Sequence, residues 1–578
     1  MRARGPRFAL RVAVASILAS AAPAPADGGE IPTGVPDLAL RLDTTFRYNL
    51  GIRTSPVDDR IGANPNFTAG EYSVPQGGLT TNRLDLLAEL DLAWGRAGAR
   101  VSAAGWYDQA YANRSIRRSP AVTTPGTYQD DQFSSFVLDR YRGPYGEILD
   151  AFAYAGFDLG SVPITVKAGR HAQTWGEGLL LGGATHGISY SQAPLDLQKA
   201  FATPGIEAKE LYRPLAAVSA QAQLAASLSL AAQAFLEWQP FLYPEGGTFL
   251  GGADAAFRGP DWIWRPPPPP GGSYVPNGGL AWPHDLGEWG AALRWRPDAL
   301  DGTAGLYYRR YTDKFAAILV EGSPPRQYRQ FYGEGVDLVG LSFSTQALGA
   351  SFGADASYRH DTPLLAQSPA LTAPPPGQPA AILFPNGLPT LRGNTYQARG
   401  DTVHGVLNAV GVAAGVPGMS SASWALEVVY SRWLAVTANE DMFYAVGHGV
   451  CRSDPALAAA GLARTTRDGC ATRDSVGVGA GLTPTFYQAL AGVDLYLPLA
   501  LSWTIAGTSP VTFGGNEGSG TYGLGFGADV RSRWRLDLRY AGYFGRASDD
   551  GTKVTSVSGL PALLRSRGSL TFTAKATF

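Results

Sequence analysis

Apolar and polar residues alternate along much of the chain. From Leu38 to Arg53, leucines and aromatic residues occupy one parity while arginines, Asp43 and Asn49 occupy the other, and the alternation returns at 83–94, 288–296 and 534–540. Successive side chains of a strand point to opposite faces, so each stretch predicts a strand with one apolar and one polar face. A strand of about ten residues, tilted by about 40°, spans an apolar band about 25 Å tall. The stretches therefore favour membrane-crossing strands.

About 18 such strands can be placed, near 37–53, 80–94, 98–112, 147–159, 163–171, 213–224, 228–239, 285–296, 302–313, 335–346, 349–360, 401–414, 422–436, 485–495, 499–508, 519–531, 534–546 and 567–578. Short joints alternate with long ones, among them 54–79, 172–212 and 437–484. Outer-membrane barrels have short periplasmic turns and long extracellular loops. The sequence therefore predicts an all-β, transmembrane antiparallel β-barrel of about 18 strands, within about 16 to 20, with both ends in the periplasm.

The N-terminus predicts export. Four arginines, at positions 2, 4, 7 and 11, precede the apolar run 12–22, and Ala24-Pro25-Ala26 supplies a small-x-small cleavage site. A transmembrane anchor needs about 18 or more apolar residues, which exceeds this run. Residues 1–26 are therefore expected to be a signal peptide, and 27–578 the barrel, located in the cell outer membrane.

The last strand has the form of an assembly signal. Leu570, Phe572, Ala574, Ala576 and the terminal Phe578 share one parity. A C-terminal alternating strand that ends in Phe resembles the signal read by the barrel-assembly machinery. The expected partners are this machinery, outer-membrane lipid with lipopolysaccharide, and a small or hydrophobic solute.

Composition excludes some functions. A net charge of -1 does not indicate nucleic-acid binding. Only 16% of residues are charged, while the chain has 72 Gly, 26 Tyr and 24 Phe, which suits strands that face lipid on one side and water on the other. Cys451 and Cys470 fall in one polar segment and are expected to form a disulfide, with free thiols as the alternative. His448 is the only histidine near them, so no metal site is expected.

A barrel of this size leaves an interior too wide for its own side chains to fill. The lumen-side charges include both signs, such as Arg47, Asp85, Asp91, Arg535 and Asp537. Mixed sign argues against a strongly ion-selective pore, and pairing of these charges across strands is the favoured reading.

Segment 172–212 differs from an exposed loop because it is rich in apolar residues. We expect it to fold into the barrel mouth and narrow the channel; the alternative is a lid packed on neighbouring loops. The candidate constriction and ligand-contact residues are Trp175, Glu177, Asp196, Glu207, Lys209 and Arg213.

Short motifs here resemble a known family. They are Gly169-Arg170-His171, Trp175-Gly176-Glu177, Pro194-Leu195-Asp196, Pro204-Gly205-Ile206-Glu207, Lys209-Glu210, Arg213-Pro214, Glu237-Trp238 and Gly246-Gly247-Thr248-Phe249. The chain resembles the proteobacterial outer-membrane family catalogued as domain of unknown function 1302, over essentially all of the mature chain. The resemblance implies a barrel without established activity, associated with lipid-like or hydrophobic substrates. Substrate-specific porins and polysaccharide exporters remain alternatives.

Catalysis is not expected, and no cofactor is implied. No two of the six histidines have a His-x-x-x-His spacing, and Arg359-His360-Asp361, the best candidate for proton chemistry, lacks a nucleophile. Two functions remain. The leading one is a channel or uptake protein, possible solutes being hydrophobic or lipid-like; the alternative is a non-conducting binding or structural protein with a plugged lumen.

Overall fold

The computed structural model describes residues 29–202, 206, 208–265, 273–320, 327–366, 379–385 and 397–578. The predicted signal peptide, 1–26, lies outside the described residues. Among the described residues, no helix is long and apolar enough to cross a membrane.

The fold is a closed antiparallel barrel of 18 wall strands, which confirms the prediction. Strand β26 pairs with β2 from Thr45↔Thr577 to Arg53↔Ser569 and closes the ring. The wall consists of β2 (Leu38–Arg53), β3 (Leu79–Trp94), β4 (Ala97–Asp108), β5 (Tyr145–Leu159), β6 (Val162–His171), β7 (Leu215–Ala225), β8 (Leu228–Phe235), β11 (Trp289–Trp295), β12 (Gly302–Tyr311), β15 (Val336–Ala347), β16 (Ala350–Pro363), β17 (Arg399–Ala414), β18 (Ser421–Ala438), β19 (Asp474–Leu490), β20 (Val493–Tyr496) with β21 (Leu499–Ala506), β22 (Gly520–Val530), β23 (Trp534–Phe544) and β26 (Ser569–Thr577).

The remaining elements are not wall strands. The short strands are β1 (Gly29–Ile31), β9 (Trp262–Arg265), β10 (Ser273–Leu280), β13 (Ala317–Val320), β14 (Tyr328–Phe331), β24 (Ala547–Asp549) and β25 (Val554–Val557). The α-helices are α2 (Asp59–Gly62), α3 (Thr68–Tyr72), α4 (Ser135–Val137), α5 (Leu181–His186), α6 (Leu197–Ala202), α7 (Ala208–Leu211), α8 (Ala380–Leu383), α9 (Pro455–Ala459) and α10 (Leu560–Leu563). The other short helices are η1 (Gln109–Tyr111), η2 (Gln129–Asp131), η3 (Leu138–Arg142), η4 (Glu440–Met442), η5 (Gly449–Cys451) and η6 (Thr466–Asp468).

The wall strands present apolar side chains outward and polar ones inward. On β2, Tyr48, Leu50 and Ile52 are exposed, whereas Arg47 and Asn49 are buried. Apolar side chains on the outer face would be unfavourable in water, because exposed apolar surface raises the free energy of the fold. The arrangement is therefore stable only where lipid contacts the outer face. The strands therefore form a membrane barrel.

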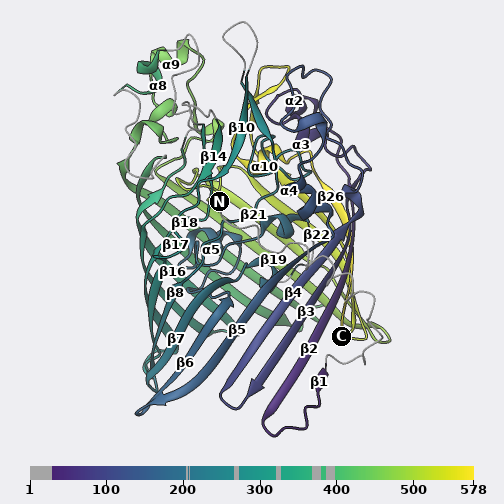
Figure 1. Ribbon diagram of the computed structural model, residues 1–578, viewed down its shortest axis with the longest axis vertical. Helices are drawn as coiled ribbons and strands as arrows, with labels where there is room; N and C mark the ends of the chain where they lie inside the picture. Colours follow the sequence, from purple (N-terminus) through teal and green to yellow (C-terminus); the bar gives the residue numbers. More distant parts are fainter. Residues whose placement is uncertain are drawn as a thin grey trace.

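Figure 1 shows short turns at one end of the barrel, near β1, and long connections with α2, α8 and α9 at the other. We call these the short-turn end and the long-loop end. Phe578 exchanges backbone hydrogen bonds with Thr44 (3.0 and 2.8 Å), so the C-terminus lies beside the start of β2. Phe572 is among the exposed residues of the outer face. A disulfide joins Cys451 to Cys470 in the connection between β18 and β19 at the long-loop end.

One strand boundary was wrong. The strand predicted at 485–495 begins at Asp474 as β19, and the turn comes at 491–492, after which β20 and β21 form one wall strand interrupted at Leu497-Pro498. Three successive lumen-facing positions of β19, between Ser475 and Thr483, are Gly477, Gly479 and Gly481. The sequence pattern therefore missed the start of β19, because apolar residues there alternate with glycine and not with polar residues.

Candidate functional site

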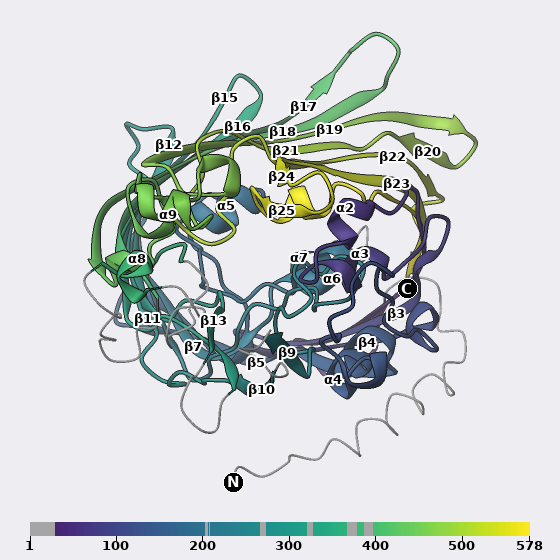
Figure 2. The ribbon, with the colours of Figure 1, turned by 90° about the horizontal axis from the view of Figure 1, so that it is seen from above.

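The connection between β6 and β7 lies inside the barrel; we call residues 172–214 the lumen segment, described except at 203–205 and 207. Figure 2 shows its helices α5, α6 and α7 within the ring of strands. Helix α5 contacts β17, β18 and β19, whereas α6 and α7 make ion pairs with β2, β3 and β5, a third to a half of the way round the ring from β18 in strand order. The segment therefore crosses the lumen from one wall to the other.

Two buried wall carboxylates hold the backbone of the lumen segment. Glu427 on β18 accepts hydrogen bonds from the backbone N–H groups of Leu179, Leu180 and Gly183 at 2.7 to 3.0 Å. Asp355 on β16 accepts from the N–H groups of Glu177 (2.9 Å) and Ile188 (3.3 Å). Hydrogen bonds to ionised acceptors are roughly twice as strong as neutral ones. These two residues therefore fix the path of the chain around α5.

Two buried wall arginines bind the carbonyls of the same stretch. Arg309 on β12, 1% exposed, donates to the carbonyls of Ile188 and Tyr190 at 2.7 Å each. Arg359 on β16 donates to the carbonyls of Thr185 (2.9 Å) and Gly187 (3.1 Å). The Arg359 guanidinium also lies 4.1 Å from the Tyr190 ring centroid. Together with the carboxylates, the arginines satisfy backbone groups that would otherwise be buried without partners.

A histidine pair adds a further contact between α5 and the wall. Nε2 of His186 donates to the carbonyl of Gly514 (2.9 Å), since a carbonyl can only accept. In the neutral ring, Nδ1 of His186 then accepts from Nδ1 of His404 on β17 (3.0 Å), whose Nε2 accepts from Thr402 (2.9 Å). Burial lowers the pKa of His186 to about 4. With both rings neutral, every ring nitrogen of the pair has a hydrogen-bond partner, so the pair adds a further attachment of α5 to the wall.

The other end of the lumen segment is held by ion pairs between side chains. Glu210 pairs with Arg47 on β2, Lys209 with Glu89 on β3, and Lys199 with Glu147 on β5. Asp196 pairs with Arg140 of η3 at 2.9 Å. Because each side chain meets an opposite charge, this end does not present a surface of one sign to a solute.

An aromatic cluster joins the lumen segment to three other connections, those between β8 and β11, β12 and β15, and β21 and β22. The rings of Tyr190, Phe315, Tyr243 and Phe513 are in contact with centroids 4.8 to 5.8 Å apart. The contacts are stacked except the one between Tyr243 and Phe315, whose planes are tilted by 39°. Three of the rings are buried, whereas Phe513 is 41% exposed. The cluster therefore ends in one accessible aromatic face.

A cavity of about 260 Å³ lies between α5 and the wall strands β18 to β22. Its lining side chains include Leu180, His186, Glu427, Val429 and Phe513, and the wall contributes Gly477, Gly479, Ala500, Ser502, Thr504 and Thr521. Small wall residues leave this space open.

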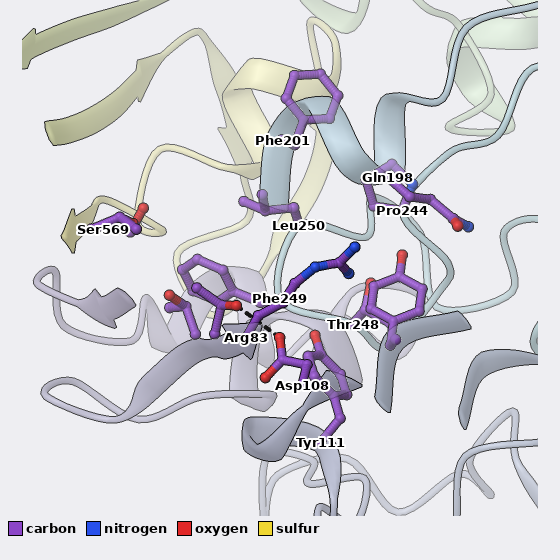
Figure 3. A pocket seen from close by; sticks show the side chains of 14 residues that line it. Arg83, Asp108, Tyr111, Gln198, Phe201, Pro244, Thr248, Phe249, Leu250 and Ser569 are labelled. Atoms are coloured by element: carbon purple, nitrogen blue, oxygen red, sulfur yellow. Dashed lines mark hydrogen bonds between the residues drawn. The ribbon is translucent and has the colours of Figure 1, made fainter. Parts of the chain in front are cut away.

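A second pocket, of about 40 Å³, lies beside α6 near the ends of β3 and β26. Figure 3 shows Arg83, Asp108 and Tyr111 on one side of it, with Gln198 of α6 and Thr248 on the other. Thr81 donates to Asp108 at 2.7 Å at its base. Such a volume holds only a few water molecules, so this pocket is too small for an organic solute.

The structure describes five of the six predicted contact residues and places them apart. Trp175, 2% exposed, packs near Tyr307 of β12, and Glu177 lies beside β16. Asp196 and Lys209 lie in the ion pairs of the opposite side, and Arg213 donates to the carbonyl of Pro240 at 3.0 Å. Glu207 lies outside the described residues. The five described residues therefore contact the wall or other connections at separate places in the lumen.

Sequence reasoning missed the wall anchors Asp355, Glu427 and Arg309, and placed Arg359 only in a proton-chemistry motif whose His360 is exposed and pairs with Asp401 at 2.8 Å. The available signal was a lone charge inside an otherwise apolar strand, as in Leu426-Glu427-Val428. A charge at such a position needs a partner inside the lumen.

Several solved structures are similar in arrangement. OpdK of Pseudomonas aeruginosa, in a crystal structure with vanillate, is 10% identical, with 93% of this chain and 98% of that chain covered and a TM-score of 0.39. OccAB1 of Acinetobacter baumannii is 11% identical, with coverage of 96% and 99% and a TM-score of 0.40. The outer membrane channel DcaP of the same organism is 10% identical, with coverage of 95% and 100% and a TM-score of 0.35. Likeness at this level says nothing about the solute.

No match was found among curated proteins. A family model described as "Protein of unknown function (DUF1302)" matches residues 7–578, which is nearly the whole chain and includes the motifs at 169–214. The chain therefore belongs to the DUF1302 family, as those motifs predicted.

Proposed function

We propose that the protein is an outer-membrane channel for the diffusion or facilitated uptake of a small hydrophobic solute, with the lumen segment as its selectivity element. The observation that carries this proposal is the attachment of that segment to opposite walls, by Glu427 and Asp355 on one side and by ion pairs on the other. A segment fixed across the lumen narrows the path of a solute through the barrel.

The proposal includes location and partners. The apolar outer face suits the outer membrane, with its lipid and lipopolysaccharide as surroundings and the short-turn end and both termini in the periplasm. The terminal strand, with Phe572 and Phe578, is proposed to be the signal for the barrel-assembly machinery. No nucleic acid is proposed as a partner, because the net charge is -1.

We propose no enzymatic activity. A Gly-x-Ser-x-Gly spacing does occur at 349–353, but it lies at the turn from β15 into β16, where Ser351 pairs with Gln346 and Val410. A nucleophile elbow needs a turn from a strand into a helix. Ser351 is therefore better explained as a wall residue.

Conductance in a planar bilayer tests the channel. Replacing residues 178–192 by a short Gly-Ser linker removes α5 and its wall contacts. The conductance should rise severalfold and larger solutes should pass, because the segment that narrows the lumen is gone. The barrel itself should still form, because the wall hydrogen bonds that close it are untouched. Excising 455–461 from the polar connection at the long-loop end should change conductance little. Equal conductance of the 178–192 variant and the unmodified protein would favour a lid or binding surface.

One observation favours the alternative of a plugged, non-conducting binding protein. Arg53 of β2 and Arg567 both pair with Glu71 of α3, and all three side chains are fully buried. This triad holds a further connection, 54–78, against the chain before β26. If neither the unmodified protein nor the 178–192 variant conducts when purified and folded, the plugged, non-conducting function is the better explanation.

A further inference from the structure

The cavity beside α5 exists because the wall there is built from very small residues. A Cβ added at Gly479 would lie 2.7 Å from the Leu180 side chain, and one at Gly477 would lie 3.0 Å from Val429. Ala500 and Ser502 continue the small-residue surface on β21. The two glycines therefore let Leu180 and Val429 pack directly on the wall backbone, and the small side chains of Ala500 and Ser502 leave the adjoining space open.

Phe513 is held in a conformation that points to a role. Its φ is 60°, in the left-handed region, where a bulky residue is a strained outlier. The surrounding turn is fixed by hydrogen bonds from Gly514 N to Val511 O (3.1 Å) and from Ser509 N to Gly515 O (2.9 Å). Its ring stacks on Tyr243 with the planes 15° apart, yet it is 41% exposed and lines the cavity. Strain of this kind persists where it positions a group that is used.

The titratable groups that line the cavity are already occupied. Glu427 accepts three backbone hydrogen bonds from the lumen segment. His186 has both ring nitrogens engaged, with Gly514 and His404. A charged solute would lose its hydration here without gaining an opposite charge from either residue, so the cavity favours a neutral one.

We propose that this cavity binds a neutral, planar aromatic solute of about two fused rings, stacked on the exposed face of Phe513. The proposal rests on the proposed channel function and names its solute class. A cavity of about 150 Å³ accepts benzene, so about 260 Å³ suits a molecule of naphthalene size. Offset stacking adds attraction beyond the burial of apolar area, which selects flat rings over alkyl chains.

Binding of radiolabelled naphthalene to the full chain in nanodiscs tests the site, with empty nanodiscs as the baseline for partition into lipid. Phe513→Ala should weaken binding about tenfold and Phe513→Leu about threefold, because leucine keeps apolar contact but not stacking. Ala500→Leu should abolish binding by filling the cavity. Phe526→Ala is the matched control, since Phe526 is 48% exposed on the outer face, and it should bind like the unmodified protein.

Each variant is first checked for a folded barrel by its heat-dependent gel mobility. Saturable naphthalene binding that Phe513→Ala and Ala500→Leu reduce supports the site even if the protein does not conduct, in which case only the proposed channel fails. Naphthalene binding that is equal in all folded variants overturns the site even if the protein conducts. Decane that competes as well as naphthalene, together with full binding by Phe513→Leu, overturns the aromatic class.

Discussion

The two ends of the lumen segment are attached by different chemistry. Near β2, β3 and β5, side chain meets side chain in ion pairs such as Arg47 with Glu210. Near β16 to β18, wall side chains such as Glu427 meet the backbone of the segment. On the ion-paired side, long side chains occupy the volume between the segment and the wall. On the backbone-attached side, the wall binds the backbone of the segment, so the side chains of the segment can be small. The larger cavity lies on the backbone-attached side for this reason.

Removing the backbone attachment should have the largest effect. Glu427→Ala leaves the N–H groups of Leu179, Leu180 and Gly183 without their acceptor. Loss of several charge-assisted hydrogen bonds should cost about 3–5 kcal/mol of local stability. Conductance should rise severalfold, and hydrogen exchange at 179–183 should accelerate. Glu427→Gln, which keeps one acceptor oxygen, should lie between. Unchanged exchange in Glu427→Ala would refute the anchoring role.

Breaking the opposite attachment should have a smaller effect. Arg140→Ala removes the partner of Asp196, but Asp196 keeps the backbone N–H of Lys199 (3.0 Å) and Glu147 keeps the Lys199 ammonium. The expected loss is therefore about 2 kcal/mol. Faster exchange should be confined to α6, and naphthalene binding should be preserved. Loss of binding would show that the two ends are not independent.

Acid should act on the two ends in opposite directions. The pKa of His186 is lowered by burial to about 4, so its neutral contact is complete above pH 6.5 and is lost as the pH falls toward 4. Burial raises the pKa of Glu245, which bonds Gln198 of α6, to about 7, so its burial becomes easier as the pH falls from 7 toward 4.5.

From pH 7 to pH 5, attachment of α5 should therefore weaken by about 2 kcal/mol. Hydrogen exchange, corrected for its intrinsic pH dependence, should increase at 184–187 and decrease at 245–246. His186→Gln should remove the first change only. Parallel changes at both sites would mean that acid acts on the whole barrel.

The smallest effect is expected from Lys209→Ala. The Lys209 side chain is 40% exposed, and water screens its pairing with Glu89. Exposed pairs contribute about 0–1 kcal/mol. Thermal unfolding and conductance should match the unmodified protein within error. A clear change in conductance would place Lys209 in the conducting path, whereas a clear change in thermal unfolding would show that its pair with Glu89 stabilises the fold.

Alternation predicted the wall because lipid and water impose opposite demands on neighbouring residues. It failed at β19, where Gly477 and Gly479 stand in place of polar residues. Apolar content predicted that 172–212 turns inward, but not its partners. Glu427 lies 244 positions from Gly183, and no periodicity reports which connection meets which strand. The cavity depends on which wall strands the lumen segment contacts, so it could not be predicted from the sequence either.

The lumen segment enters the chain between β6 and β7, yet its anchors lie on β12, β16 and β18. Contacts so distant in sequence cannot form until the later strands exist. During assembly, these contacts therefore form only after β12, β16 and β18 have been added to the wall. The ion-pair partners on β2, β3 and β5 come earlier in the chain than the segment, so we expect the backbone-attached side of the constriction to become ordered after the ion-paired side.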